Sequence, residues 1–144
     1  EFIPGSIEAI ATLSKRFGKI VVVTNQQGIG KRLMTEMDLE KIHFYMQEEI
    51  AKKGGRIDAI YYCPYLSSIK PKCRKPEIGM ALQAKEDFPQ IDFTKSVMVG
   101  DSKTDMEFGK KIGAITIFIT PTSTVDVLAD YIAKSLSEIN AIID

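Results

Sequence analysis

The sequence predicts an α/β fold in which a mostly parallel β-sheet carries helices on both of its faces. Two observations lead to this fold class. Short apolar runs rich in Val and Ile alternate along the chain with longer segments whose apolar residues recur at helical spacing. Neither an internal repeat nor a low-complexity linker interrupts this alternation. Strands separated by helices need crossover connections, and such connections produce parallel sheets, so we expect residues 1–144 to form a single domain.

Four of the expected elements lie in the first half of the chain. Residues 6–17 place their apolar side chains near one helical face, and the β-branched run at 19–25 is typical of a strand covered on both sides. Thr35 and Asp38 have the spacing of a capping box at the start of a second helix. Residues 57–62 predict the second strand. The apolar stripe of the second helix consists of Leu39, Ile42, Met46 and Ile50.

The second half continues the alternation. Pro76 suits the first position of a helix, which we expect to run from 76 to about 87. The run at 96–100 predicts a third strand, 102–112 a short helix, and 114–120 a fourth strand. A Ser followed by Glu three residues later, with apolar spacing after them, predicts a final helix in the tail at 135–143.

The composition is that of a soluble globular domain. Of the 144 residues, 44% are hydrophobic and 26% are charged. The 19 basic and 19 acidic residues balance, so charge gives no argument for binding to nucleic acid or to a membrane surface. No apolar stretch has transmembrane length, and no signal-peptide pattern is visible. Two cysteines make no disulfide framework, so we expect a cytoplasmic protein.

The candidate chemistry lies where the predicted strands end, because open parallel sheets bind ligands beyond the carboxyl ends of their strands. Thr24 and Asn25 follow one strand, Asp101 follows another, and Lys75 precedes a helix. A hydroxyl, free amides and an ammonium near a helix N-terminus can hold a phosphate. A carboxylate would repel that phosphate unless a cation stood between them, and Mg²⁺ is the usual ion. We therefore predict a Mg²⁺ ion that bridges Asp101 to a phosphate.

Asp105, four residues after Asp101, has more than one possible role. It can accept a hydrogen bond from a bound water or from Lys75, or it can only cap its own helix, since Ser102 and Asp105 also have capping-box spacing. Taken singly, the other candidates also have structural explanations, such as the β-propensity of Thr24 or solvation of Lys75. The prediction depends on all of them meeting at one edge of one sheet.

His43 is the only histidine of the chain. It lies on or beside the predicted buried stripe, which favours a packed or partly exposed helix residue over a catalytic one. Without a second histidine, a serine or cysteine triad has no base, and Thr24 as a hydrolase nucleophile is unsupported.

The segments VVVTNQQGIG, YYCPY, CRKP and VMVGDSKTDM together resemble a known family. The sequence is similar to the haloacid dehalogenase (HAD)-like phosphohydrolases, in the branch of the heptose-bisphosphate phosphatases and the histidinol-phosphatase domain. The resemblance covers almost the whole chain, and it is specific because the motifs occur in this order and spacing. It implies a Rossmann-like domain without a large cap domain, and an Mg²⁺-dependent phosphatase that forms an aspartyl-phosphate intermediate.

The resemblance also implies roles for single residues. Thr24, with Asn25 and Gln26 of the same motif, would bind the transferring phosphoryl group. Lys75 would stabilise the charge of the transition state, and Asp101 would bind Mg²⁺ together with the nucleophile. Independently of the resemblance, the spacing of Asp105 from Asp101 would place it beside that metal site, in reach of a bound water.

Arg74, beside Lys75, would contact the substrate by the same resemblance. Lys31 and Arg32 could meet a distal phosphate or could simply be exposed loop charges. The Gly-Ile-Gly segment resembles the histidinol-phosphatase branch, whereas YYCPY and KPEIGM resemble the heptose branch. We expect a small phosphorylated metabolite as the partner, a sugar (heptose) bisphosphate, with histidinol phosphate as the alternative, and a monomeric protein.

The sequence departs from the family at the catalytic carboxylates. The family carries an Asp-x-Asp motif on a first strand, ahead of the segment that matches EFIPG, so we expect the nucleophile and the general acid/base upstream of Glu1. The alternative is a non-catalytic, degenerate domain that has lost this strand. Loss of the strand would leave an unpaired gap or a new edge in the sheet.

A second departure lies in the loop after YY. Many relatives hold a structural zinc there, but the matching positions read Cys63-Pro64-Tyr65 and Pro71-Lys72-Cys73. Two of the four ligand positions, at Tyr65 and Pro71, are substituted, and two thiolates make a poor tetrahedral site, so we expect no zinc. A Cys63–Cys73 disulfide is possible in geometry but not expected in a cytoplasm.

A signalling receiver domain is a competing, non-enzymatic interpretation, since receivers combine Asp, Thr, Lys and Mg²⁺ on a similar fold. In receivers the phosphoacceptor Asp precedes the Thr and the Lys. Here Thr24 and Lys75 both precede Asp101, which argues against a receiver.

Overall fold

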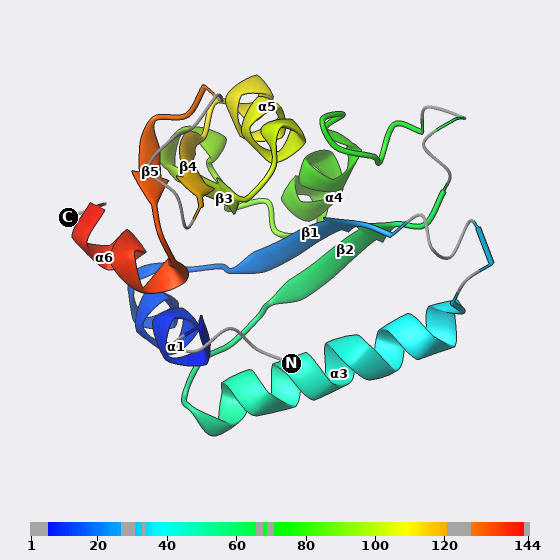
Figure 1. The fold of residues 1–144 in the computed structure, drawn as a ribbon, viewed down its shortest axis with the longest axis horizontal. Coiled ribbons are helices and arrows are strands. Elements are labelled where there is room, and N and C mark those ends of the chain that lie inside the picture. The colour runs from blue at the N-terminus through cyan, green and yellow to red at the C-terminus, as the bar shows by residue number, and fades with distance from the viewer. Residues whose placement is uncertain are drawn as a thin grey trace.

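The predicted alternation of strands and helices is present in the computed structural model, which describes residues 6–26, 31–32, 34–65, 68, 71–120 and 128–142. Among the described residues, short 3₁₀ turns accompany the α-helices and strands, and Figure 1 shows how the helices and strands are arranged. In chain order the elements are α1 (Ser6–Arg16), β1 (Val21–Asn25), α3 (Glu36–Lys52), β2 (Ala59–Cys63), α4 (Gly79–Asp87), η2 (Phe93–Lys95), β3 (Val97–Gly100), α5 (Lys103–Ile112), β4 (Ile115–Ile119), β5 (Tyr131–Ala133), η3 (Leu136–Glu138) and α6 (Ile139–Ile142).

Every strand pair in the described residues is parallel, as predicted, but the strands form two hydrogen-bonded groups. β1 pairs with β2, and β4 pairs with β3 on one side and β5 on the other. The registers place Val23 opposite Tyr61 and Val99 opposite Ile117. Within the part of the chain that the structure describes, no ladder joins β1 to β3. The sheet is therefore interrupted between these two strands.

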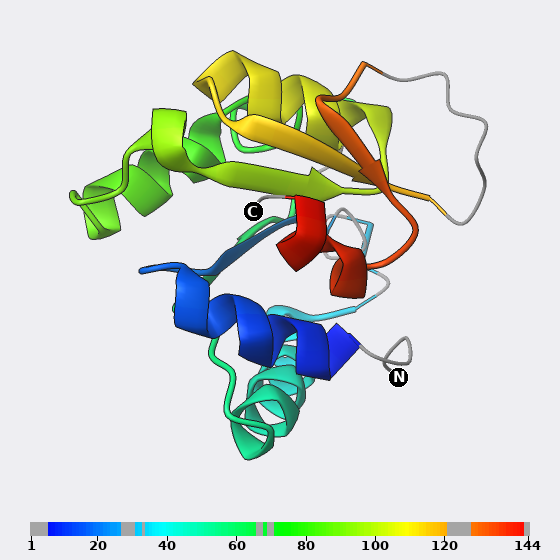
Figure 2. The same ribbon diagram turned by 90° about the vertical axis from the view of Figure 1, so that its left-hand side faces the viewer.

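Helices cover both faces of the strands, which confirms the predicted fold class. Helix α4 packs on β1 and β2, and α5 packs on β3 and β4. Helices α1 and α3 pack against each other on the opposite side (Figures 1 and 2). Burial of apolar helix side chains against strands or a neighbouring helix is the usual way in which such a layer is stabilised.

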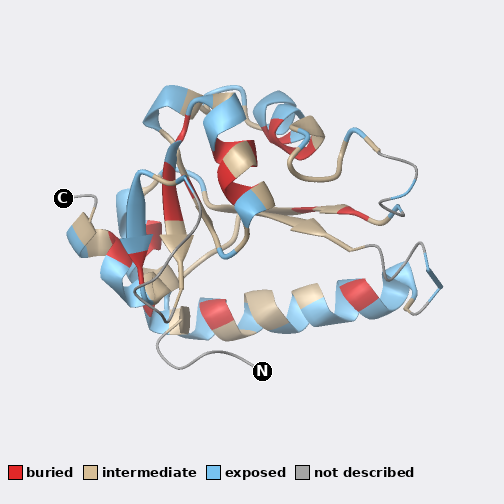
Figure 3. Ribbon diagram, turned by 45° about the horizontal axis from the view of Figure 1, so that its top comes forward, coloured by how far each residue is buried: buried red, intermediate tan, exposed pale blue. Residues whose placement is uncertain are grey.

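The core consists of three clusters of buried apolar side chains, seen as red segments along the strands and inner helix faces (Figure 3). Full burial of one large apolar side chain stabilises the fold by roughly 1.5–3 kcal/mol. Val23 of β1 packs against two of the clusters and so connects the two strand groups through side chains. The buried members are Leu13, Ile117, Ala133 and Ile139; Tyr61, Cys63, Met80 and Ala84; and Ala81, Met98, Phe108 and Ala114.

Helix α3 begins with the predicted capping box. The Thr35 hydroxyl accepts a hydrogen bond from the Asp38 N–H, and the Asp38 carboxylate accepts one from the Thr35 N–H, both at 3.0 Å. The predicted apolar stripe is wrong at Ile42, whose exposed fraction is 53%. Its place is taken by His43, half-buried beside Tyr62, as expected for a packed histidine; burial lowers the pKa of His43.

The predicted start of the next helix at Pro76 is wrong. Helix α4 begins at Gly79, and residues 74–78 form a turn in which the Lys75–Pro76 peptide is cis. The turn is held by backbone bonds, from the Glu77 N–H to the Arg74 carbonyl at 2.8 Å and from the Gly79 N–H to the Lys72 carbonyl at 3.0 Å. These longer-range bonds outweigh the local preference of proline for a first helical position.

The tail contains a strand that the sequence pattern does not reveal. β5 is three residues long, too short for a recognisable period. It is placed by its parallel pairing with β4 and by a bond from the N–H of Thr120, directly after β4, to the Ala133 carbonyl. The predicted tail helix is a 3₁₀ turn followed by four α-helical residues within the described residues. None of the helices in the described ranges combines the length and apolar character needed to cross a membrane.

Candidate active site

The predicted site residues lie at the carboxyl ends of the parallel strands. Thr24 and Asn25 end β1, Asp101 follows β3 directly, and Lys75 lies in the segment between β2 and α4. The structure brings Asn25, Lys75 and Asp105 into direct contact. Residues that are far apart in the sequence thus meet at one edge of the sheet, as the strand-end argument predicts.

Lys75 and Asp105 form the central ion pair of this site. Lys75 Nζ lies 2.6 Å from Asp105 Oδ1, and the two side chains are only 11% and 8% exposed. Lys75 Nζ also donates a hydrogen bond to the Val23 carbonyl at 3.0 Å. A buried ammonium needs such compensation, because an unpaired charge in the interior is costly.

Asp105 fills two of the roles that its spacing left open. Its Oδ2 accepts hydrogen bonds from the Asp101 and Ser102 N–H groups at 3.2 and 3.3 Å, and the Ser102 hydroxyl accepts one from the Asp105 N–H. This is the predicted capping box at the start of α5. Its Oδ1 accepts no well-directed hydrogen bond and is compensated by the charge of Lys75. Asp105 therefore links the cap of α5 to Lys75.

Gly100 makes room for this arrangement. A Cβ atom at this position would lie 2.6 Å from the Asp105 Cγ, well inside van der Waals contact. The glycine at the end of β3 is therefore needed for the close approach of the Asp105 carboxylate to the backbone.

Asn25 and Gln26 contact protein groups. The Asn25 Oδ1 accepts a hydrogen bond from the Lys75 N–H at 3.0 Å, and the Asn25 Nδ2 lies 3.5 Å from the Lys75 carbonyl oxygen. The Gln26 Nε2 donates to the Thr24 Oγ1 at 3.0 Å. The contact between Asn25 and Lys75 is a feature that sequence reasoning missed, because one of its partners is backbone and carries no residue-type signal.

Asp101 is exposed, and its carboxylate makes no hydrogen bond or ion pair with the described residues. An uncommitted carboxylate is a suitable ligand for a hard cation such as Mg²⁺. Asp105 is already committed to its cap and to Lys75, and the described residues contain no group of three acidic, His or Cys side chains that could hold a metal. They therefore fit part of a magnesium site, to which Asp101 contributes one oxygen ligand.

The remaining predicted residues are less closely tied to this site. Arg74 is half-buried, and its guanidinium has no partner within the described ranges. Lys31 and Arg32 are exposed, and Arg32 has a positive φ of 60°. Among the described contacts, none joins Lys31 or Arg32 to Lys75 or Asp101.

Cys63 and Cys73 are joined in a disulfide, so the expectation of unbonded thiols is wrong. The turn brings the two Cα atoms to 5.4 Å, within the usual range for disulfides. It connects the end of β2 to the segment that carries Lys75, and both sulfur atoms are used in the bond.

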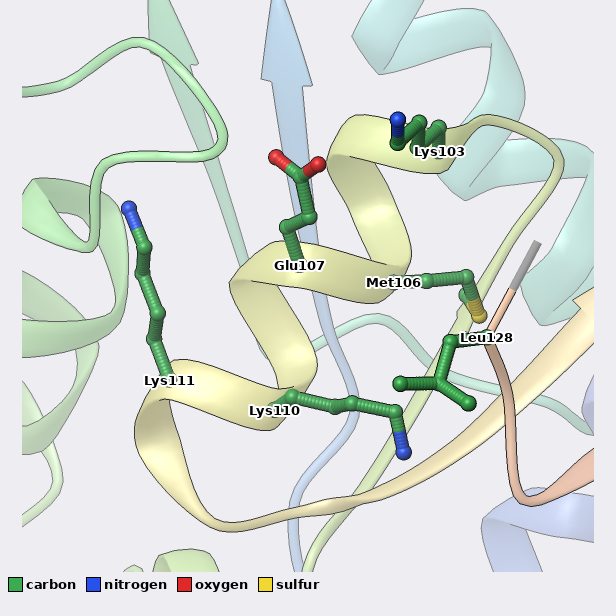
Figure 4. A pocket seen from close by; sticks show the side chains of 6 residues that line it. All are labelled: Lys103, Met106, Glu107, Lys110, Lys111 and Leu128. Carbon is green, nitrogen blue, oxygen red and sulfur yellow. The ribbon is translucent and has the colours of Figure 1, made fainter.

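A hollow of about 380 Å³ lies on the outer face of α5, away from the Lys75–Asp105 pair. Lys103, Lys110, Lys111 and Glu107 line it together with Met106 and the exposed Leu128, and Met106, Leu128 and Lys110 lie close together (Figure 4). Its lysines do not converge on one point, so it lacks the few well-placed polar groups that distinguish a ligand site. The strand-end cluster remains the better candidate, because its polar groups are held by specific contacts.

Comparison with known sequences connects this geometry to a family. Residues 72–139 match the family model described as HAD-hydrolase-like. The chain is 38% identical over 114 residues to the D-glycero-alpha-D-manno-heptose-1,7-bisphosphate 7-phosphatase of Mycobacterium bovis, covering 79% of this chain and 60% of that protein. It is 36% identical over 151 residues to the D-glycero-beta-D-manno-heptose-1,7-bisphosphate 7-phosphatase of Salmonella typhi, covering 96% of this chain and 80% of that protein.

Solved structures give the same result. The D,D-heptose 1,7-bisphosphate phosphatase of B. bronchiseptica, crystallised with magnesium and phosphate, superposes with a TM-score of 0.85 at 26% identity. The superposition covers 98% of this chain and 82% of that chain. The corresponding enzyme of Burkholderia thailandensis has a TM-score of 0.70 at 28% identity, over 98% of this chain and 84% of that chain. With this sequence identity to the Salmonella relative and this fold, the chain belongs to the HAD-like hydrolases, in the branch of the heptose-bisphosphate phosphatases.

Proposed function

We propose that the protein is a Mg²⁺-dependent phosphatase that hydrolyses a small sugar bisphosphate, of the heptose 1,7-bisphosphate class, through an aspartyl-phosphate intermediate. The observation that carries the proposal is that two groups lie at the same sheet edge: the buried ammonium of Lys75, held by Asp105, and the exposed carboxylate of Asp101, which has no partner among the described residues. The names of the relatives and the magnesium and phosphate in one solved neighbour support the substrate class and the metal.

The nucleophile and the general acid/base are proposed to lie upstream of Glu1, on a strand that fits between β1 and β3. The interruption of the ladder between these strands supports this position. The Gln26 N–H is directed at the Cys63 carbonyl of β2, and backbone groups alternate between the two edges of a strand. The Val23 carbonyl is therefore directed away from β2, toward the interruption.

The residues of this chain would bind and orient the phosphoryl group. The Lys75 ammonium would balance the charge that develops on the phosphoryl oxygens, and Asp105 would hold it in place without competing for the substrate. The Thr24 hydroxyl and the guanidinium of Arg74 would donate to phosphate oxygens, with Gln26 orienting Thr24. Asp101 would hold the Mg²⁺ ion, which when bound supplies charge neutralisation between carboxylates and phosphate.

A monomer that acts on a soluble metabolite in the cytoplasm completes the proposal. The Cys63–Cys73 disulfide is unusual for that compartment, where thiols are kept reduced.

The test is phosphate release by the full-length protein from heptose 1,7-bisphosphate, with histidinol phosphate as the comparison substrate. We expect Mg²⁺-dependent release that EDTA abolishes and added Mg²⁺ restores. Asp101→Asn should abolish it, whereas Asp92→Asn, an exposed Asp at the start of η2, should leave it unchanged. Full activity in EDTA, or of Asp101→Asn, would overturn the proposal.

A further inference from the structure

The side chain of Asn25 uses both of its polar atoms on the backbone of one residue. Its Oδ1 accepts a hydrogen bond from the Lys75 N–H at 3.0 Å, and its Nδ2 lies 3.5 Å from the Lys75 carbonyl oxygen. Both contacts are partly buried and join residues fifty positions apart in the chain. The amide thus pairs with Lys75 in the way that a residue of a neighbouring strand would.

This pairing requires the chemistry of an amide. A carboxamide carries an acceptor oxygen and a donor NH₂ group side by side in a single plane, which matches the N–H and C=O of one residue. The orientation of the amide follows from its partners, because the Lys75 N–H can only donate and must face the oxygen. A carboxylate in the same place could accept from the N–H but would face the Lys75 carbonyl without a donor.

The consequence for Lys75 is that its backbone and its ammonium are held separately. Asn25 holds the backbone, while the Val23 carbonyl and Asp105 hold Nζ at 3.0 and 2.6 Å. A lysine ammonium stands at the end of a flexible four-carbon stem. Its position is therefore well defined only when the backbone that carries the stem is also fixed. β1 supplies Asn25, so it sets the position of the Lys75 backbone.

We infer that Asn25 is a positioning residue, which holds the backbone of Lys75 so that its ammonium reaches the phosphoryl site, and that it is not a ligand of the substrate. The resemblance to the family implies a phosphoryl contact for Asn25. In this chain its donor and its acceptor are both directed to Lys75. The inference rests on the proposed function for its catalytic consequence, but the placement of Lys75 can be measured without it.

The first measurement needs no activity. Lysines of the full-length protein are labelled with a trace of acetic anhydride, and the labelling rate of Lys75 is read by mass spectrometry. In Asn25→Ala we expect Lys75 to react several-fold faster, because its largely buried ammonium loses a fixed backbone. Asn140→Ala in α6 is the matched control and should leave the rate unchanged. An unchanged Lys75 rate in a folded Asn25→Ala protein overturns the inference.

The second measurement separates positioning from substrate binding. Asn25→Ala should lower kcat on the order of 10²-fold, as expected for displacement of a catalytic group by about 1 Å. In a Lys75→Ala background the same change should have little further effect, because its target is gone. If the two losses multiply in the double variant, Asn25 acts on the substrate directly and the inference is wrong.

Asn25→Asp is a second, more conservative variant for the labelling measurement, to be used in case Asn25→Ala does not fold. It keeps the shape and the acceptor for the Lys75 N–H, and it should give a labelling rate between those of the wild type and Asn25→Ala. If full-length protein hydrolyses no tested phosphate ester, the proposed function fails, but the labelling experiment still decides the role of Asn25. A labelling rate equal to the wild type in both variants would overturn that role.

Discussion

Lys75 Nζ and Asp105 Oδ1 are 2.6 Å apart and are both largely withdrawn from solvent, although thirty residues separate them in the chain. Asp105 belongs to the helix that follows β3, and Lys75 to the segment that follows β2. Their contact therefore spans the interruption between the two strand groups, where no backbone ladder of the described residues makes a connection. One ion pair thus serves both the assembly of the fold and the proposed chemistry.

Replacing Asp105 by Asn should destabilise the protein by about 3–5 kcal/mol, because it leaves the buried Lys75 ammonium without a counter-charge. The measurement is the free energy of unfolding in urea. Asp101→Asn is the matched control: Asp101 is exposed and unpaired among described residues, so its replacement should change stability by less than about 0.5 kcal/mol. Equal losses in the two variants would show that the ion pair adds nothing to stability.

Gly100→Ala should displace the Asp105 side chain, since a Cβ atom would overlap with it. Overpacking of this kind costs about 1–3 kcal/mol, and the displaced carboxylate should also weaken its contact with Lys75. The combined Gly100→Ala and Asp105→Asn variant should be less destabilised than the sum of the single changes. Gly18→Ala, at a position where a Cβ would have no atom within 4 Å, is the matched control and should be close to neutral.

Much of the site could be predicted because its signals are local. The capping spacing of Ser102 and Asp105, and the strand that ends before Asp101, are read from adjacent residues. Which group Asp105 Oδ1 faces depends on a residue thirty positions earlier, so the spacing could only leave alternatives open. The Asn25 contact to the Lys75 backbone has no residue-type pattern on its backbone side, and no reading of the sequence could have found it.

The fold, like the site, has features that local sequence signals predict and features that depend on distant residues. The capping box of α3 and the parallel strands follow from local spacing and from the alternation of elements. The start of α4 at Gly79 does not, because it depends on a backbone bond back to Lys72, and β5 is too short to show a period. The disulfide differs from the expectation because composition indicates only the usual compartment, whereas the turn decides whether two sulfur atoms meet.

Removing the Cys63–Cys73 bond should lower the stability by about 2–3 kcal/mol, because the bond closes a loop of ten residues and restricts the unfolded chain. The comparison is unfolding in urea with and without a reductant. The Cys63→Ala and Cys73→Ala double variant should be insensitive to the reductant. A wild type that is equally stable with and without the reductant would contradict a structural role for the bond.

The hydroxyl of Tyr61 should make stability fall at alkaline pH. Burial, and then its hydrogen bond to Asp87 at 2.6 Å, raise the pKa of Tyr61 from 10.0 to about 12. Between these two values the unfolded chain releases the phenol proton while the folded protein keeps it, so unfolding becomes more favourable as the pH rises through this window. Below pH 10 both states hold the proton, and the contribution is fully present.

Tyr61→Phe isolates this effect from other groups that titrate in the same range, including Tyr62, whose pKa burial also raises. The variant should lose about 0.5–1.5 kcal/mol at neutral pH with the hydrogen bond to Asp87, and its deficit relative to the wild type should shrink as the pH rises from 10 to 12. The measurement is urea unfolding at intervals of half a pH unit. A deficit that stays constant across the window would mean that the phenol titrates alike in both states, and that its burial against Asp87 does not hold the proton.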